Sequence, residues 1–224
     1  LGVGLESIMD FGWSFIRPIS KGVLYALKSM HGFIPNYGFV LIVFAFLIKL
    51  IVYPLTKKSY QSMSAMQAVA PEINELKEKY KSNPTKLNQA TMELYKKRGV
   101  NPLGGCLPML LQMPLLFALF QVFRTTIELR AEPFIWWITD LSSPDTVLLL
   151  PFKIPIYGSH VAILPVLMVV SMFVQQRMMS GAAQQPQQKT MQYFMTAFFF
   201  LMFNGFPSGL NLYYTLFNVL TIAQ

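Results

Sequence analysis

Residues 190–224 read TMQYFMTAFFFLMFNGFPSGLNLYYTLFNVLTIAQ and contain no charged residue. A helix that crosses the hydrocarbon core of a membrane needs about 20 mostly apolar residues. FPSG at 206–209 divides this longer run, because proline and glycine favour a turn. The pattern predicts two short transmembrane helices, 190–205 and 210–224, joined by a turn at 206–209. Both are shorter than a core of about 30 Å, so the membrane should thin around them unless the last helix continues beyond residue 224.

Three more apolar segments precede this run, at 37–56, 102–127 and 161–178. Charged residues make up 12% of the chain, about half the roughly 25% of soluble domains. Hydrophobic residues make up 54%, and the mean hydropathy is +0.44. This composition argues against a disordered chain, and against a nucleic-acid-binding module despite the isoelectric point of 9.6. The sequence predicts an all-α membrane protein with five transmembrane helices.

The 57–101 segment differs from the rest, because 13 of the 28 charged residues lie between residues 55 and 102. Apolar side chains recur in two short series on either side of Ser82-Asn83-Pro84. Asn83 suits a helix cap, Pro84 a first helical position and Gly99 a helix end. We expect a mobile cytoplasmic helical hairpin. Its basic surface is either simply solvated or contacts anionic lipid, a ribosome or a partner protein.

The basic residues of the loops predict the orientation of the chain. The 57–101 segment has nine basic and four acidic residues, and the 179–189 loop has one basic and no acidic residue. The 128–160 loop has two basic and four acidic residues. Five helices place the first two loops on one side and the third on the other, so the chain should begin outside and end inside. Aromatic residues in the outer loop suit a membrane interface: Phe134, Trp136 and Trp137.

Residues 1–36 carry apolar side chains mostly three or four positions apart, with charged residues between them. This spacing predicts an amphipathic helix along the outer membrane surface, broken near Pro18. A linker helix that only anchors the first transmembrane helix explains the pattern equally well.

Lys49 is the one charged residue in the 37–56 segment, about 10 Å from the cytoplasmic end of its helix. A lysine at the membrane centre costs on the order of 2.5–3.5 kcal/mol on insertion scales. Either its long side chain carries the ammonium to the interface, or the ammonium faces a water-filled cavity open to the cytoplasm. No predicted transmembrane helix contains an acidic residue to pair with it. Polar residues at the middle or inner half of the other helices favour the cavity: Gln112, Ser171, Gln175, Gln176 and Asn218.

Methionine and phenylalanine are dense on two of the predicted helices. Along 102–127 they recur with leucine every three or four residues, and seven of the ten residues from 194 to 203 are methionine or phenylalanine. Such side chains adapt to varied apolar partners, although ordinary helix packing or lipid contact explains the same pattern. These side chains include Met109, Met113, Leu116 and Phe120, and Phe194, Met195, Phe198, Phe199, Met202 and Phe203.

No motif for catalysis is present. His31 and His160 lie outside the predicted helices, and Ser208 lacks the glycine two positions earlier that a rhomboid-like protease uses. The sequence has no zinc motif and no phosphate-binding loop, and the single Cys106 excludes an internal disulfide. We therefore expect neither an enzyme nor a bound metal or cofactor.

Three motifs resemble those of the YidC/Oxa/Alb insertase family. They are YPLTK at 53–57 after a basic residue in the helix, NPLGGC at 101–106 followed by QMP at 112–114, and FPSG at 206–209 followed by LYY at 212–214. Their order and spacing agree with the family from about Phe11 to the end. Each motif alone is weak, but together they are specific.

The resemblance implies a groove that is open to the cytoplasm and the lipid and closed toward the outside. Its basic residue matches Lys49, where many members have arginine, so charge attraction carries over but bidentate recognition does not. Tyr214 matches a groove tyrosine, and the expected polar lining is Gln112, Ser171, Gln175, Tyr214 and Asn218. The resemblance also implies an apolar slide for the incoming helix, on the second and fourth transmembrane helices: Met109, Met113, Leu116, Met202 and Phe203.

The implied function is that of a membrane protein insertase and assembly chaperone in the bacterial cytoplasmic (inner) membrane, working without ATP or a cofactor. Nascent membrane proteins and membrane lipids are its expected partners, with the Sec translocon and the ribosome as further candidates and no direct recognition of nucleic acid. Two other functions stay open. An anion transporter or channel would use Lys49 as its binding charge but needs a path to the outer side. A passive assembly scaffold would depend on the methionine and phenylalanine residues and not on Lys49.

Overall fold

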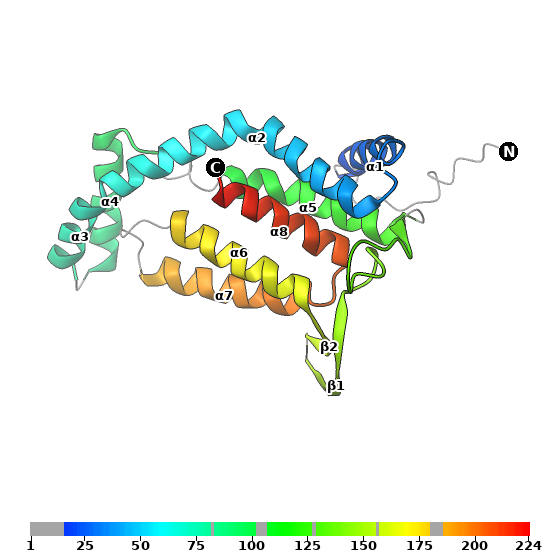
Figure 1. Ribbon diagram of the computed structural model, residues 1–224. Coiled ribbons are helices and arrows are strands. Elements are labelled where there is room, and N and C mark those ends of the chain that lie inside the picture. Colours follow the sequence, from blue (N-terminus) through cyan, green and yellow to red (C-terminus); the bar gives the residue numbers. More distant parts are fainter. Residues whose placement is uncertain (1–15, 82, 102–106, 127–128, 156, 180–185) are drawn as a thin grey trace.

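The computed structural model describes residues 16–81, 83–101, 107–126, 129–155, 157–179 and 186–224. Within them the chain forms eight helices and one pair of strands (Figure 1). Their order is α1 (Arg17–His31), α2 (Tyr37–Ala68), α3 (Ala70–Lys79), α4 (Pro84–Arg98), α5 (Leu107–Thr125), β1 (Thr146–Ile154), β2 (Gly158–Ala162), α6 (Ile163–Met179), α7 (Pro186–Phe203) and α8 (Ser208–Ile222).

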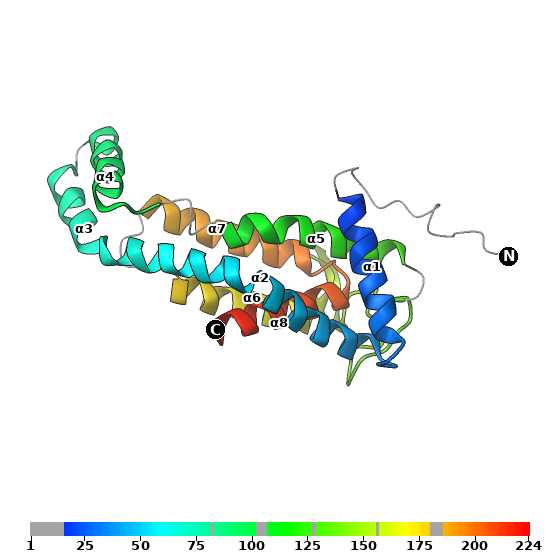
Figure 2. The same ribbon diagram turned by 90° about the horizontal axis from the view of Figure 1, so that it is seen from above.

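Helices α2, α5, α6, α7 and α8 lie lengthwise in one bundle, and α1 crosses α2 and α5 at one end (Figures 1 and 2). Helix α8 is the central element, because it packs against α2, α5 and α6. We call the end where α7 leads into α8 the turn end, and the opposite end, where α2 leads into α3, the helical-hairpin end. The helices α2, α5, α6, α7 and α8 overlap the five segments that were predicted to be transmembrane, although their bounds differ from the predicted ones.

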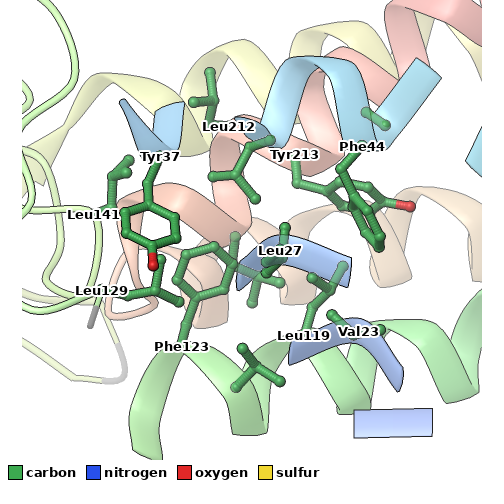
Figure 3. Packing of buried hydrophobic residues seen from close by; sticks show 14 of the residues in the cluster. Val23, Leu27, Tyr37, Phe44, Leu119, Phe123, Leu129, Leu141, Leu212 and Tyr213 are labelled. Atoms are coloured by element: carbon green, nitrogen blue, oxygen red, sulfur yellow. The ribbon is translucent and has the colours of Figure 1, made fainter. Parts of the chain in front are cut away.

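The most buried side chains gather near the turn end. Leu27 from α1, Phe123 from α5 and Tyr213 from α8 are almost completely buried, and they meet in one cluster (Figure 3). Elsewhere the helices expose large apolar side chains, such as Ile51 on α2 and Phe194 on α7. An extensive apolar surface of this kind is suited to lipid rather than to water.

Helix α2 is the longest helix of the described structure. Asn36 caps it by accepting hydrogen bonds from the backbone N–H groups of Gly38, at 2.9 Å, and Phe39, at 3.3 Å. The helix continues through Pro54. Within the described residues it alone is both long and apolar enough to cross a membrane by length and composition, while Ile163–Met178 and Thr190–Phe203 form shorter apolar helices.

The 57–101 segment, for which a helical hairpin was predicted, contains the two short helices α3 and α4. Helix α2 runs on to Ala68, because residues 57–68 contain neither glycine nor proline, so the hairpin itself consists of α3 and α4. The Asn83 side chain accepts a hydrogen bond from the Lys86 N–H at 3.0 Å, with Pro84 in the first turn of α4. Gly99 ends α4 with a φ of 66°. The cap, first turn and end predicted for this helix are therefore confirmed.

Helix α1 begins at Arg17, with Pro18 in its first turn, where the missing N–H of proline is tolerated. The preceding residues 1–15 lie outside the described part. Val23, Leu24 and Leu27 are buried, and the helix packs against α5 and α2. The helix is therefore part of the bundle as well as amphipathic.

The 128–160 loop contains structure that the sequence analysis did not predict. Strands β1 and β2 form an antiparallel hairpin in which Leu148 pairs with Val161 and Leu149 with His160. The chain is thus mostly helical but not all-α. The sequence analysis missed β1 because of Pro151. A proline inside an apolar run argues against a strand, unless the proline lies on an edge strand or at a bulge.

Candidate functional site

Lys49 lies on α2 with its side chain directed at α8. The residue is only 7% exposed, and its Nζ donates a hydrogen bond to Thr221 Oγ1 at 2.8 Å. The same Nζ lies 5.1 Å from the centre of the Phe217 ring. Thr221 in turn donates its own hydroxyl proton to the Phe217 carbonyl at 2.7 Å. A buried cation is therefore held by a hydroxyl and an aromatic face, both of which are neutral.

A second polar contact joins α8 to α6. Asn218 Nδ2 donates to Ser171 Oγ at 3.3 Å, and Ser171 Oγ donates to the Met168 carbonyl at 2.8 Å. Both Asn218 and Ser171 are buried. We call Lys49, Ser171, Asn218 and Thr221 the polar layer, since they link α2, α8 and α6 across the bundle.

Thr221 was not among the residues predicted from the sequence. Its signal lies in the spacing on α8, because Tyr214, Asn218 and Thr221 stand four and three positions apart and so share one helix face. A search for polar residues along this face, rather than for amides alone, would have found it.

Gln112 on α5 faces two tyrosines of α8. Its side chain lies against the hydroxyls of Tyr213 and Tyr214. These contacts do not have the geometry of hydrogen bonds. Gln112 Nε2 and both hydroxyl oxygens are buried and have no hydrogen-bond partner among the described residues. An unpaired buried polar atom costs about 1–3 kcal/mol, so a group of three is an unusual feature of a packed interior. We call these three residues the Gln112 cluster.

The two glutamines at the end of α6 have different surroundings. Gln175 is half-buried. Gln176 Oε1 accepts hydrogen bonds from Gln192 Nε2 at 3.0 Å and from Thr196 Oγ1 at 3.2 Å, which ties α6 to α7.

The residues expected to form the apolar slide lie in the protein interior or at its margin. Leu116 and Phe203 are buried, while Met113 and Met202 are half-buried against the same core. The Phe203 ring lies 5.9 Å from the ring of Tyr214, so the slide and the groove tyrosine are adjacent. The side chain of Met109 lies outside the described part of the structure. Their role as a slide stays a prediction.

At the turn end, polar side chains bind the backbone of distant segments. Asn204 donates to the carbonyls of Tyr157, at 2.8 Å, and His160, at 2.9 Å, and accepts from the Ala162 N–H at 3.3 Å. Asn211 Nδ2 donates to the Phe203 carbonyl at 3.1 Å. Both asparagines lie beside the turn at 206–209.

Asp145 caps α6 from the loop that precedes β1. Its Oδ2 accepts from the N–H groups of Ile163, at 3.0 Å, and Leu164, at 2.8 Å, and from Trp137 Nε1 at 3.1 Å. Ser208 donates its N–H to the Ser143 carbonyl at 2.8 Å and its hydroxyl to the Asp140 carbonyl at 2.8 Å. The segment from 129 to 145 is thus fastened across the start of α8 and α6.

Close backbone contacts also seal this end. A methyl group at Gly209 would overlap the Phe123 ring, and one at Gly38 would overlap the Phe134 ring. Two aromatic rings therefore pack directly on glycine backbone. No group of three or more His, Cys, Asp or Glu side chains that could hold a metal ion occurs in the part of the chain that the structure describes.

Known proteins resemble this chain in both sequence and structure. The model of the family described as "60Kd inner membrane protein" matches residues 29–224. A protein named "Membrane protein insertase YidC" from Pelodictyon phaeoclathratiforme is 50% identical over 224 residues, which is 99% of this chain and 38% of that protein. Its namesake from Chlorobium phaeovibrioides is 52% identical over 222 residues, covering 98% of this chain and 38% of that protein.

A solved structure has the same arrangement. It is titled "Active YidC insertase crystal structure with the first transmembrane domain resolved", is 27% identical, and superposes with a TM-score of 0.70 over 92% of this chain and 45% of that chain. The chain therefore spans less than half the length of these relatives. The resemblance to the YidC/Oxa/Alb insertases drawn from the three motifs is confirmed, and the chain belongs to the 60Kd inner membrane protein family.

Proposed function

We propose that this chain is the membrane-embedded core of an insertase and assembly chaperone that moves short hydrophilic tails of nascent membrane proteins across the bilayer. The observation that carries the proposal is the buried ammonium of Lys49, which contacts the neutral groups of Thr221 and Phe217. A cation held in this way is available to an incoming carboxylate.

The proposed topology has five transmembrane helices, α2, α5, α6, α7 and α8, with the turn end outside and the helical hairpin in the cytoplasm. The nine basic residues of 57–101 support this orientation. The membrane is the bacterial inner membrane, in keeping with the family. The basic helical hairpin is then placed to meet anionic lipid, a ribosome or the Sec translocon.

The tail enters a groove lined by the polar layer, the Gln112 cluster and Gln175. Moving a polar tail into an apolar medium is costly unless hydrogen-bond partners replace water. The unpaired atoms of the Gln112 cluster supply such partners to water or to the tail itself. Lys49 adds charge attraction, worth up to about 4 kcal/mol for a carboxylate at about 4 Å and an effective dielectric constant of 20.

The apolar segment behind the tail leaves along α5 and α7. Met113 and Met202 are half-buried at this boundary, and flexible methionines can repack around different helices. Transfer of the segment into lipid supplies the drive, so neither ATP nor a cofactor is needed.

The test is insertion of a single-helix protein with a short acidic tail into liposomes that contain the protein. The variants are Lys49→Ala and Lys49→Arg, and the tail's protection from external protease is measured. A matched substrate carries a neutral tail of equal length. Lys57→Ala is the control variant, because Lys57 lies on the same helix but is exposed.

Lys49→Ala should reduce insertion of the acidic tail by about tenfold or more, since each 1.4 kcal/mol corresponds to a factor of ten. Lys49→Arg should keep most of it, and Lys57→Ala should change little. Equal insertion by Lys49→Ala and the native protein, for both tails, would show that the buried cation does no work in insertion.

A further inference from the structure

The β-hairpin, formed by β1 and β2, has no place in the route proposed above. It projects sideways from the turn end, beside the ends of α6 and α7 (Figure 1). Its inner strand is well supported, because Asn204 at the end of α7 binds the backbone of Tyr157, His160 and Ala162. The hairpin is therefore a fixed part of the fold with a free outer strand.

That free strand, β1, exposes large apolar side chains. Leu148 is 58% exposed, Leu149 73% and Phe152 61%. Successive side chains of a strand point to opposite faces, so Leu148 and Leu149 lie on different faces of the hairpin. Exposed apolar strands at a sheet edge promote aggregation in water, and natural proteins usually protect them with charges or cover them.

Charge gives this strand little protection. Residues 146–162 contain one lysine, Lys153, one histidine, and no acidic residue. The loop just before the hairpin is different, since 128–145 contains four acidic residues. The chain changes from an acidic loop to an apolar hairpin within a few residues. This change indicates that the loop lies in water and that the hairpin lies in a different environment.

The position of the hairpin relative to α7 indicates what the environment of the hairpin is. The Tyr157 ring, in the hairpin turn, lies 5.5 Å from the ring of Phe200, which is about one turn inside α7. The hairpin is therefore level with the last turn of α7 rather than above it. Exposed apolar side chains on α6, such as Val166 and Leu167, continue this apolar surface next to the base of the hairpin.

From this placement we propose that β1 is immersed in the lipid leaflet at the turn end, with Leu148, Leu149 and Phe152 among the lipid chains. The open edge of β1 limits its depth, because unpaired backbone groups are not tolerated in the hydrocarbon core. The hairpin thus lies at the boundary between headgroups and acyl chains. It anchors the ends of α6 and α7 in the membrane.

The test measures which reagents reach a nitroxide label on β1. The full chain, with Cys106→Ser, carries a single label at Leu149→Cys and is reconstituted in vesicles of phosphatidylethanolamine and phosphatidylglycerol. Collisions are compared for oxygen, which concentrates in lipid, and for a water-soluble nickel chelate. Two references bracket the result: Phe194→Cys on α7, where the native side chain is 64% exposed, and Lys81→Cys in the helical hairpin, which is also exposed.

The label at Leu149 should give an oxygen-to-nickel ratio severalfold above that at Lys81 and close to that at Phe194. A label at Leu148→Cys repeats the measurement on the opposite face, and lipid access at either position supports the proposal. A ratio equal to that at Lys81 for both labels would place β1 in water and overturn it. Protection of both labels from both reagents would also overturn it, because a second protein or a second copy of this chain would then cover the strand.

Discussion

The turn end and the polar layer both contain buried asparagine and serine, but they use them in opposite ways. At the turn end, Asn204 makes three hydrogen bonds to the backbone of the β-hairpin region. In the polar layer, Asn218 donates one bond of 3.3 Å to another side chain. The first group fastens separate segments of chain, whereas the second joins side chains that are free to change partners.

The consequence concerns rigidity. Backbone groups bound by a side chain move only if a whole segment moves, so the turn end is suited to remain closed. Side chains bound to one another through single contacts can exchange them for water or a guest at little cost. A protein that admits polar tails from one side needs this combination: a fixed closure at one end and adaptable polar groups toward the other.

Replacing each asparagine by alanine tests the comparison most strongly. Asn204→Ala removes three hydrogen bonds at about 0.6–1 kcal/mol each, so it should lower the free energy of unfolding by about 2–3 kcal/mol. Asn218→Ala removes one and should lower it by less than about 1 kcal/mol. Unfolding of both variants in detergent micelles, followed by circular dichroism, measures the difference.

Each variant serves as the control for the other, since the same atoms are removed from two buried positions. Equal losses of stability would mean that the polar layer is as firmly built as the turn end. The distinction between a fixed and an adaptable region would then have no energetic basis.

Two glycines near the turn provide the next test. A methyl group at Gly209 meets the buried Phe123 ring, so Gly209→Ala should lower the free energy of unfolding by about 1–3 kcal/mol through overpacking. A methyl group at Gly205 has only the Met202 carbonyl oxygen near it, at 4.0 Å. Gly205→Ala should therefore be close to neutral. Thermal unfolding measures both variants. If Gly209→Ala were as stable as Gly205→Ala, the packing at the turn end would accommodate a methyl group without loss of stability.

The sequence predicted the helices better than it predicted the 128–160 loop, which contains the β-hairpin. Length and hydropathy located α2, α5, α6, α7 and α8, and local chemistry located the cap at Asn83 and the end of α4 at Gly99. The β-hairpin was missed because Pro151 argues against a strand, and because Asn204, which binds the hairpin backbone, lies more than forty residues away in the chain. Such long-range support has no local signal.

The candidate site was predicted in part for the same reason. Lys49 and Asn218 stand out, because a charge or an amide in an apolar run is conspicuous. Thr221 does not, because threonine is unremarkable in an apolar helix until Lys49 is seen to bind it. Asp145 was also missed, because an acidic residue in a loop is expected to be solvated. Only the fold brings it to the first turn of α6, where it accepts hydrogen bonds from the backbone.

The smallest expected effect concerns whether charge contributes to the closed end. Burial opposes ionisation of Asp140, but hydrogen bonds from Ser142, Ser143 and the Ala131 N–H outweigh it and hold the pKa of Asp140 below its ordinary value. A carboxyl with a lower pKa in the folded state stabilises that state above its unfolded pKa of about 3.9, and this stability is lost as the pH falls through the folded value. The native protein should therefore lose more stability than Asp140→Asn between neutral pH and about pH 3.

Thermal unfolding in a non-ionic detergent at the two pH values measures the difference, because Asn keeps an acceptor but cannot titrate. Parallel losses in the two proteins would assign the closure at Asp140 to hydrogen bonding alone, with no part for its charge.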